Sequence, residues 1–127
     1  MPGSFRDLEI WQEAHRLALE IYKATKGFPK EELFALVSQL RRASISVAAN
    51  IAESCGRYGI KDKIQLMIIA RGSIFETRSH LSISFDLGYI DNKTFDLIDG
   101  RYESLSKRIN AFINHLRKLK PTNQLTN

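Results

Sequence analysis

The residues of this chain that could take part in chemistry are few and widely spaced. There are three histidines and one cysteine, namely His15, His80, His115 and Cys55. A structural zinc site needs four grouped Cys or His ligands, and a di-iron bundle needs Glu-x-x-His on two helices. Glu76 and His80 are four residues apart rather than three, so neither pattern is present. The chain also lacks a glycine-rich phosphate loop. We therefore expect no metal, no cofactor and no small-molecule substrate.

One histidine has an arginine at a spacing that could support acid–base chemistry. Arg108 and His115 lie seven residues apart, which places both on one face of a helix. The pair resembles the active motif of the HEPN ribonucleases, which are also helical bundles. Those enzymes usually carry a polar residue directly after the arginine, where this chain has Ile109. A protein without catalytic activity is the main expectation, and a weak ribonuclease using Arg108 and His115 is kept as an alternative.

Four segments with helical periodicity must position these residues. They cover about residues 5–25, 30–55, 61–87 and 91–119. Gly27 to Pro29, Gly56 with Gly59, and Gly88 are the helix stops between them. Asp91 is the predicted N-cap of the last helix. Such short connections force consecutive helices to run antiparallel. The sequence thus predicts an all-α, up-down-up-down four-helix bundle over residues 1–120, followed by a disordered C-terminal tail at 121–127.

The third segment is apolar all round its circumference. Its first turns contain six apolar residues that do not form a single stripe, namely Ile64, Leu66, Met67, Ile68, Ile69 and Ala70. A helix that is apolar on two sides must bury both. One side can face the bundle, and self-association is the simplest way to cover the other.

Basic residues gather at one end of the predicted bundle, which we call the basic pole. It holds the start of the first helix, the turn after the second and the end of the fourth. Nine basic residues meet four acidic ones there, and the basic set is Arg6, Arg57, Lys61, Lys63, Lys107, Arg108, Arg117, Lys118 and Lys120. Matching to helix dipoles explains the bases of the last helix but not Lys61 and Lys63. An anion-binding surface for a phosphate backbone explains both. The predicted contacts are Arg57, Lys61, Lys63, Arg117, Lys118 and Lys120. No set of aromatic residues is interleaved with these bases, so sequence-specific readout of single strands is not indicated.

Folding the second and third helices against each other predicts two structural contacts. An arginine, Arg41 or Arg42, comes level with Glu76 and should pair with it. Gly72 in mid-helix costs about 1 kcal/mol against alanine, so we expect it to allow close backbone approach. Trp11 is expected to pack in the core over small residues of the second helix.

The overall composition limits the setting of the protein. The 127 residues are 43% hydrophobic and carry a net charge of +5, which is compatible with nucleic acid or an acidic partner. No apolar run could span a membrane or serve as a signal peptide. One cysteine cannot form an internal disulfide, so we expect a cytoplasmic protein.

The ordered motifs resemble the 23S rRNA intervening-sequence proteins, also called four-helix bundle proteins. The resemblance covers residues 5 to about 116. It rests on Phe5-Arg6-Asp7-Leu8, Trp11, Phe28-Pro29, Gln39-Leu40-Arg41-Arg42-Ala43, Asn50-Ile51-Ala52-Glu53, Ala70-Arg71-Gly72-Ser73 with Glu76, and Leu87-Gly88-Tyr89-Ile90. The family tends to have glycine after the Asn-Ile-Ala-Glu run, where this chain has Ser54. Through these motifs Arg42, Asn50, Glu53, Gly72 and Glu76, with Trp11, are assigned structural roles.

The resemblance implies a bacterial homopentameric ring without catalytic activity. It also implies kinship with the accessory protein of diversity-generating retroelements, which is thought to bind nucleic acid. Cyclic symmetry would turn every basic pole to the same side. The sequence-based hypothesis is therefore a ring-forming protein that binds RNA or other nucleic acid. The alternative from another class is a homo-oligomeric scaffold or adaptor for a protein partner.

Overall fold

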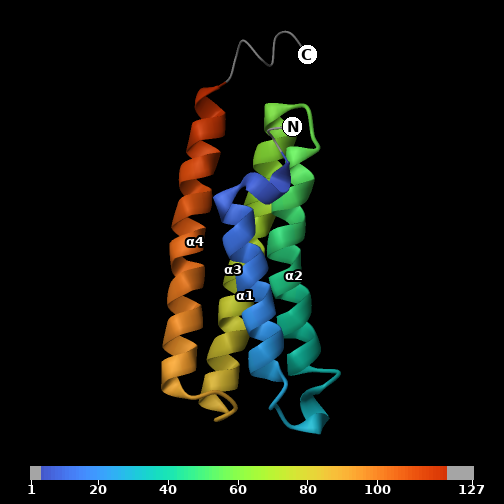
Figure 1. Ribbon diagram of the computed structural model, residues 1–127, viewed down its shortest axis with the longest axis vertical. Coiled ribbons are helices and arrows are strands. Elements are labelled where there is room, and N and C mark those ends of the chain that lie inside the picture. The colour runs from blue at the N-terminus through green and yellow to red at the C-terminus, as the bar shows by residue number, and fades with distance from the viewer. Residues whose placement is uncertain (1–3, 120–127) are drawn as a thin grey trace.

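The computed structural model describes residues 4–119, and every regular element in that range is helical (Figure 1). The elements in chain order are the 3₁₀ turn η1 (Phe5–Asp7), α1 (Glu9–Thr25), the 3₁₀ turn η2 (Lys30–Glu32), α2 (Leu36–Cys55), α3 (Ile60–Asp86) and α4 (Asn92–Lys118). The prediction of an all-α fold with four helices is confirmed for this part of the chain. Lys120 and the tail predicted at 121–127 lie outside the described residues.

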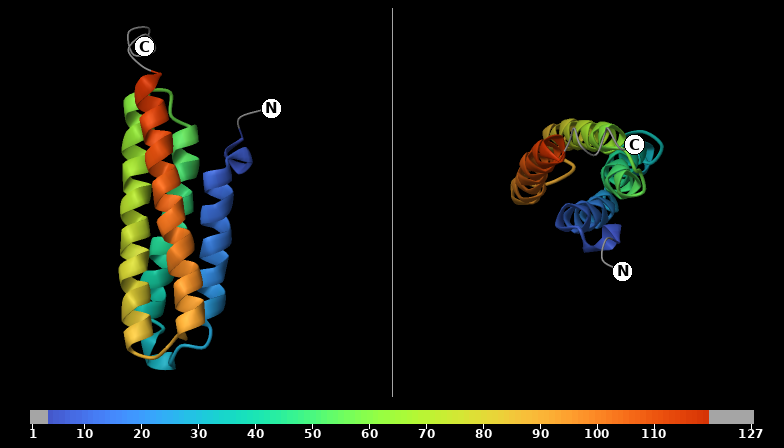
Figure 2. Two further views of the ribbon diagram at one scale, coloured as in Figure 1. Left: turned by 90° about the vertical axis from the view of Figure 1, so that its left-hand side faces the viewer. Right: turned by 90° about the horizontal axis from the view of Figure 1, so that it is seen from above.

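Consecutive helices lie side by side and run in opposite directions (Figure 1). Their side-chain contacts match rising residue numbers on one helix with falling numbers on the next. These contacts join Arg42 to Glu76 and Ser46 to Ser73 between α2 and α3, and Arg78 to Asp99 and Arg71 to Asn110 between α3 and α4. Seen from above, the helices follow one another in chain order around a common axis (Figure 2).

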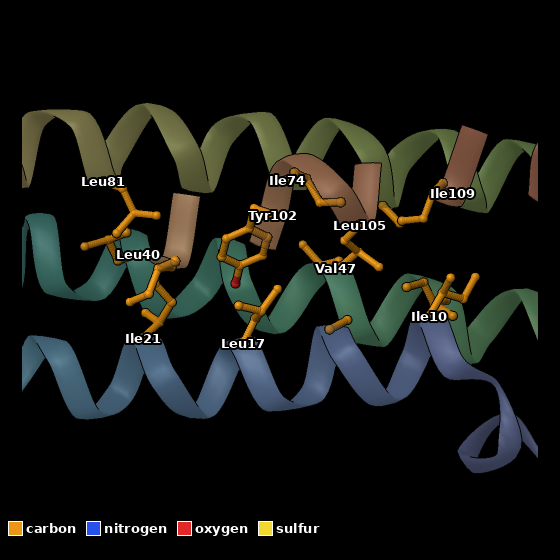
Figure 3. Close-up of a cluster of buried hydrophobic side chains, with 14 of the residues drawn as sticks. Ile10, Leu17, Ile21, Leu40, Val47, Ile74, Leu81, Tyr102, Leu105 and Ile109 are labelled. Atoms are coloured by element: carbon orange, nitrogen blue, oxygen red, sulfur yellow. The ribbon is translucent and has the colours of Figure 1, made fainter. Parts of the chain in front are cut away.

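A single core runs the length of the four helices. Its fully buried side chains recur at steps of three and four residues, as a helix facing a bundle interior requires. Figure 3 shows Leu17 and Ile21 of α1, Leu40 and Val47 of α2, Ile74 and Leu81 of α3, and Tyr102, Leu105 and Ile109 of α4 converging there. Within residues 4–119, no helix is long and apolar enough to cross a membrane.

The second helix begins later than the sequence predicted. Residues 30–32 form the short η2 turn, and α2 starts only at Leu36, because Ala35 has φ −121° and ψ −101°, outside the helical region. The first helix likewise starts at Glu9, since residues 5–7 form the separate turn η1. Glu31 and Glu32, which a helix over residues 30–55 would have in its first turn, lie in the η2 turn instead.

Glu32 joins the two connections at the end of the bundle opposite the basic pole. The Tyr89 hydroxyl donates a hydrogen bond of 2.9 Å to its carboxylate. This contact raises the pKa of Tyr89, because the acceptor is negatively charged. The Tyr89 ring packs on Phe28 with centroids 5.2 Å apart. Gly88 ends α3 with a φ of +81°, the left-handed conformation that favours glycine.

The start of α4 is capped as predicted. The Asp91 carboxylate accepts the backbone N–H of Thr94 at 2.7 Å, and this bond lowers the pKa of Asp91 because it stabilises the ionised form.

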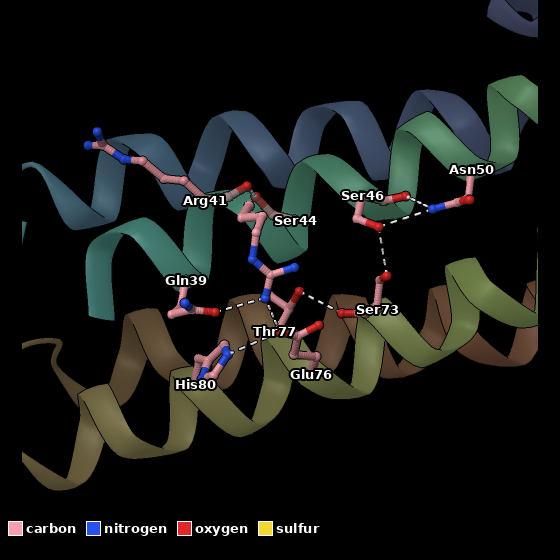
Figure 4. Close-up of polar contacts among 10 residues, drawn as sticks. Gln39, Arg41, Ser44, Ser46, Asn50, Ser73, Glu76, Thr77 and His80 are labelled. Atoms are coloured by element: carbon pink, nitrogen blue, oxygen red, sulfur yellow. Dashed lines mark hydrogen bonds and ion pairs between the residues drawn. The ribbon is translucent and has the colours of Figure 1, made fainter. Parts of the chain in front are cut away.

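A polar seam joins α2 to α3 along their shared face (Figure 4). The Ser46 and Ser73 hydroxyls lie 2.9 Å apart, and the Asn50 amide donates to the Ser46 carbonyl at 2.8 Å. Arg42 forms the ion pair with Glu76 that the helix register predicts. These polar contacts fix the register of the two helices beside the apolar core.

Gly72 does not lie at a close approach between helix backbones, so the prediction for this residue is wrong. A side-chain carbon at this position would meet no atom within 4 Å, and Gly72 is exposed. The small residue that faces α2 is its neighbour Ser73, which is buried. The prediction was off by one residue, and one residue turns a helical side chain by about 100°.

The seam between α1 and α4 closes the bundle, and it joins the first helix to the last. Arg101 donates two hydrogen bonds to the Glu13 carboxylate, of 2.9 and 3.0 Å, and both side chains are mostly buried. The pKa of Glu13 is lowered by this guanidinium, whose hydrogen bond outweighs the opposing effect of burial.

Candidate nucleic-acid interface

The basic pole is built from the starts of α1 and α3 and the ends of α2 and α4, toward the top of Figure 1. The exposed cations there include Arg57 in the turn, Lys61 on α3, and Arg117 and Lys118 on α4. Of the six predicted contact residues, these four lie at the surface of one end of the bundle. Lys120 lies outside the described residues.

Lys63 is used within the fold. Its side chain is half-buried, and its Nζ donates a hydrogen bond of 3.1 Å to the backbone carbonyl of Ser54. That carbonyl belongs to the last turn of α2, where carbonyls lack helical partners. Lys63 therefore fastens the start of α3 to the end of α2. The predicted phosphate contact of Lys63 rested on spacing, and spacing alone does not show which way a side chain turns.

Arg57 is exposed but has a carboxylate partner. It forms an ion pair of 2.6 Å with Glu53, one helical turn earlier, and this contact raises the pKa of the arginine. Both side chains are about half accessible to solvent, so the pair is weak and an incoming phosphate can compete for the guanidinium. Glu53, predicted as structural, orients Arg57.

Lys61 and Lys118 have no charge partner among the described residues. Neither makes an ion pair or side-chain hydrogen bond within residues 4–119, and Arg117 contacts only the Asn114 amide oxygen, at 3.4 Å. Helix-dipole matching suits Arg117 and Lys118, which lie in the last turn of α4, but not Lys61, which lies in the first turn of α3.

Arg108 and His115 line one hollow between the start of α1 and the end of α4. The hollow has a volume of about 530 Å³ and is also lined by Asp7, Glu9 and Phe112. The structure thus brings the two predicted ribonuclease residues to the same place. The Arg108 guanidinium is held by the Glu9 carboxylate at 3.4 Å.

The other reactive side chains lie apart from one another. His15 stacks on Trp11 with centroids 4.7 Å apart, and His80 lies 3.5 Å from the Glu76 carboxylate. Cys55 is half-buried at the end of α2. Over residues 4–119, no group of three His, Cys, Asp or Glu side chains could hold a metal ion.

Trp11 packs at the border of the core instead of in its centre. Its indole is partly buried against the core and meets the Phe5 ring edge-on, with centroids 5.1 Å apart. Trp11 therefore fastens η1 to the bundle at the basic pole.

One exposed residue at the basic pole was missed by the sequence analysis. Tyr58 lies between Arg57 and Lys61 and is 97% accessible. The signal for it was available, because an aromatic residue stood beside cations in a predicted turn. A single tyrosine does not form the repeated aromatic set that indicates a stacking surface.

The fold and the basic pole define a four-helix protein with a positively charged end. A family model described as "23S rRNA-intervening sequence protein" matches residues 6–111, and the chain belongs to this family. Its fold is similar to the crystal structure of a protein of unknown function from the S23 ribosomal protein family of Bacteroides thetaiotaomicron. That similarity has a TM-score of 0.76 and 22% identity over 82% of this chain and 97% of the other. A search of curated proteins found no match.

Proposed function

We propose that this protein is a non-enzymatic, ring-forming four-helix bundle that binds RNA through its basic pole. The observation that carries the proposal is the group formed by Lys61, Arg117 and Lys118. These cations are exposed at one end of the molecule, and no carboxylate among the described residues pairs with them. Such cations bind a phosphate backbone by releasing its counterions. The name of the family, which refers to sequences that interrupt 23S rRNA, supports RNA as the polyanion.

Self-association is supported by apolar side chains on the outer surface of α3. Ile69, Phe75 and Ile83 are 44%, 52% and 47% accessible although the helix also buries a full core face. An isolated chain leaves this second apolar face in water, and a second copy would cover it. The resemblance noted above implies a pentamer, in which every basic pole would lie on the same rim.

The absence of catalysis is supported by the residue that follows Arg108. The HEPN motif usually has a polar residue there, whereas Ile109 is fully buried in the core of this chain. The pair of Arg108 with Glu9 is exposed and does not by itself withhold the arginine from a phosphate. A labelled RNA that stays intact with the wild-type protein, across a range of pH and divalent ions, is the expected result. Cleavage that Arg108→Ala abolishes would establish the ribonuclease alternative.

Charge reversal tests RNA binding. We expect the triple variant Lys61→Glu, Arg117→Glu, Lys118→Glu to lose binding, and partial variants to lower the slope of log K against log salt. Three single-strand phosphate contacts correspond to a slope change of about 2. The matched control reverses Lys26, Lys30 and Lys93, which are exposed at the opposite end and change the net charge equally. Equal losses in both triple variants would refute a localised interface.

Light scattering tests the ring and separates the remaining alternative. A monomer at micromolar concentration would contradict self-association. An intact oligomer that binds no RNA at low salt would favour the scaffold or adaptor for a protein partner.

A further inference from the structure

Tyr58 is the most accessible large apolar or aromatic side chain among residues 4–119, at 97%. It contacts no other ring, and its hydroxyl has no hydrogen-bond partner among these residues. A tyrosine in water leaves a large apolar surface uncovered, and such surfaces often serve in recognition. Packing within the chain does not account for its position.

The turn that carries Tyr58 is firmly held on both sides. Before it, the N–H groups of Gly56 and Arg57 bond to carbonyls of the last turn of α2 at 3.0 and 3.3 Å. After it, Ile60 is buried in the core, and the Lys63 ammonium is bonded to Ser54. The ring is therefore presented from a fixed backbone, which lowers the entropy lost when a ligand binds.

Cations flank Tyr58 in the sequence of the turn. Arg57 precedes Tyr58 and Lys61 follows it by three residues, and both are exposed. The acids nearby are Glu53, which is paired with Arg57, and Asp62, which is also exposed. An aromatic face beside cations is the arrangement by which proteins hold a single strand, with a base on the ring and its phosphates on the cations.

We propose that Tyr58 stacks against an unpaired base, so that the basic pole prefers single-stranded to double-stranded RNA. The inference rests on the proposed function and names its class of ligand. In an A-form duplex both faces of each base are covered by neighbouring bases. Tyr58 thus adds to the affinity for a single strand, while Lys61 and Lys118 serve either form.

The test measures binding of a labelled single-stranded RNA of mixed sequence and of the same sequence as a duplex. Tyr58→Ala is expected to weaken single-strand binding about tenfold and to change duplex binding less than twofold. Tyr58→Phe keeps the ring and should bind as the wild type does. The matched control is Phe34→Ala, because Phe34 is 91% exposed at the opposite end of the bundle.

Each other outcome points to a distinct failure. Wild-type binding that is salt-dependent but unchanged in Tyr58→Ala, or weakened equally for both forms, overturns the stacking role and leaves the basic pole standing. A wild-type protein that binds neither RNA overturns both proposals. A change in the mass of the Tyr58→Ala assembly by light scattering would make Tyr58 a contact between copies and overturn the stacking role.

Discussion

The ion pair between Glu13 and Arg101 offers the sharpest test of how the bundle closes. It joins α1 to α4, which are the least closely packed of the neighbouring helices. Both hydrogen bonds are charge-assisted, and the Glu13 side chain is only 15% accessible. Replacing Arg101 by methionine keeps much of the apolar stem and removes both bonds.

The expected loss follows from what remains around Glu13. Its carboxylate would keep one contact, to Arg16 at 3.4 Å, in a largely buried position. Leaving such a charge without its main partner costs about 2 kcal/mol of the free energy of unfolding, after allowance for partial exposure. An unfolding entropy of about 2 cal/mol/K per residue converts this to a fall in melting temperature of roughly 8 °C.

The same pair predicts a pH dependence. The pKa of Glu13 in the folded state is lowered below its ordinary value of 4.5. The stabilisation is therefore fully present above about pH 4.5 and is lost as the pH falls through the folded-state pKa. In Glu13→Gln this contribution disappears, so stability should fall less steeply with acidification than in the wild type.

Thermal unfolding at a fixed protein concentration, followed by circular dichroism, measures these effects. The matched control is Arg42→Met, which breaks a more exposed pair with Glu76 and should cost less than about 1 kcal/mol. The double variant Glu13→Gln, Arg101→Met should recover part of the loss, because the unpaired charge is gone. An Arg101→Met variant no less stable than Arg42→Met would refute the reasoning.

Three further substitutions test the packing. The Tyr102 hydroxyl is buried without a partner among the described residues, so Tyr102→Phe should raise the free energy of unfolding, measured with urea, by up to about 1 kcal/mol. A clear fall would show that the hydroxyl is bonded. Gly72→Ala should raise the free energy of unfolding by about 0.5–1 kcal/mol, and with it the melting temperature, because the alanine side chain would meet open space. A lower melting temperature, together with a smaller assembly mass by light scattering, would place Gly72 between copies. Asp91→Ala should cost about 1 kcal/mol by urea denaturation while Asp91→Asn costs less, and equal stability of all three proteins would show that the cap to Thr94 contributes nothing.

Local sequence signals located the helices well where a cap or a breaker was strong. Asp91 and Gly88 marked the junction of α3 and α4 because both act within a few residues. Such signals were misleading at residues 30–35, where acids typical of a first turn lie in a 3₁₀ turn instead. The contact of Glu32 with Tyr89, distant in sequence, is made from that turn. No local pattern reveals such a contact.

For the candidate site, the sequence predicted where the cations lie but not which of them are available to a ligand. Composition and helix order placed the cations at one end, because charge and chain direction are enough for that. Which cations remain available depends on side-chain direction, and here Lys63 turns to the carbonyl of Ser54 while Lys61 faces solvent.

The sequence by itself determined the helical class, the apolar faces and the end at which positive charge gathers, since each follows from local periodicity and residue type. Only the tertiary structure decided that Ser73 rather than Gly72 meets α2, that Glu13 and Arg101 close the bundle, and that Tyr58 is left uncovered. The physical reason is that contacts between helices depend on rotation about each helix axis. A single residue of shift there exchanges a buried position for an exposed one.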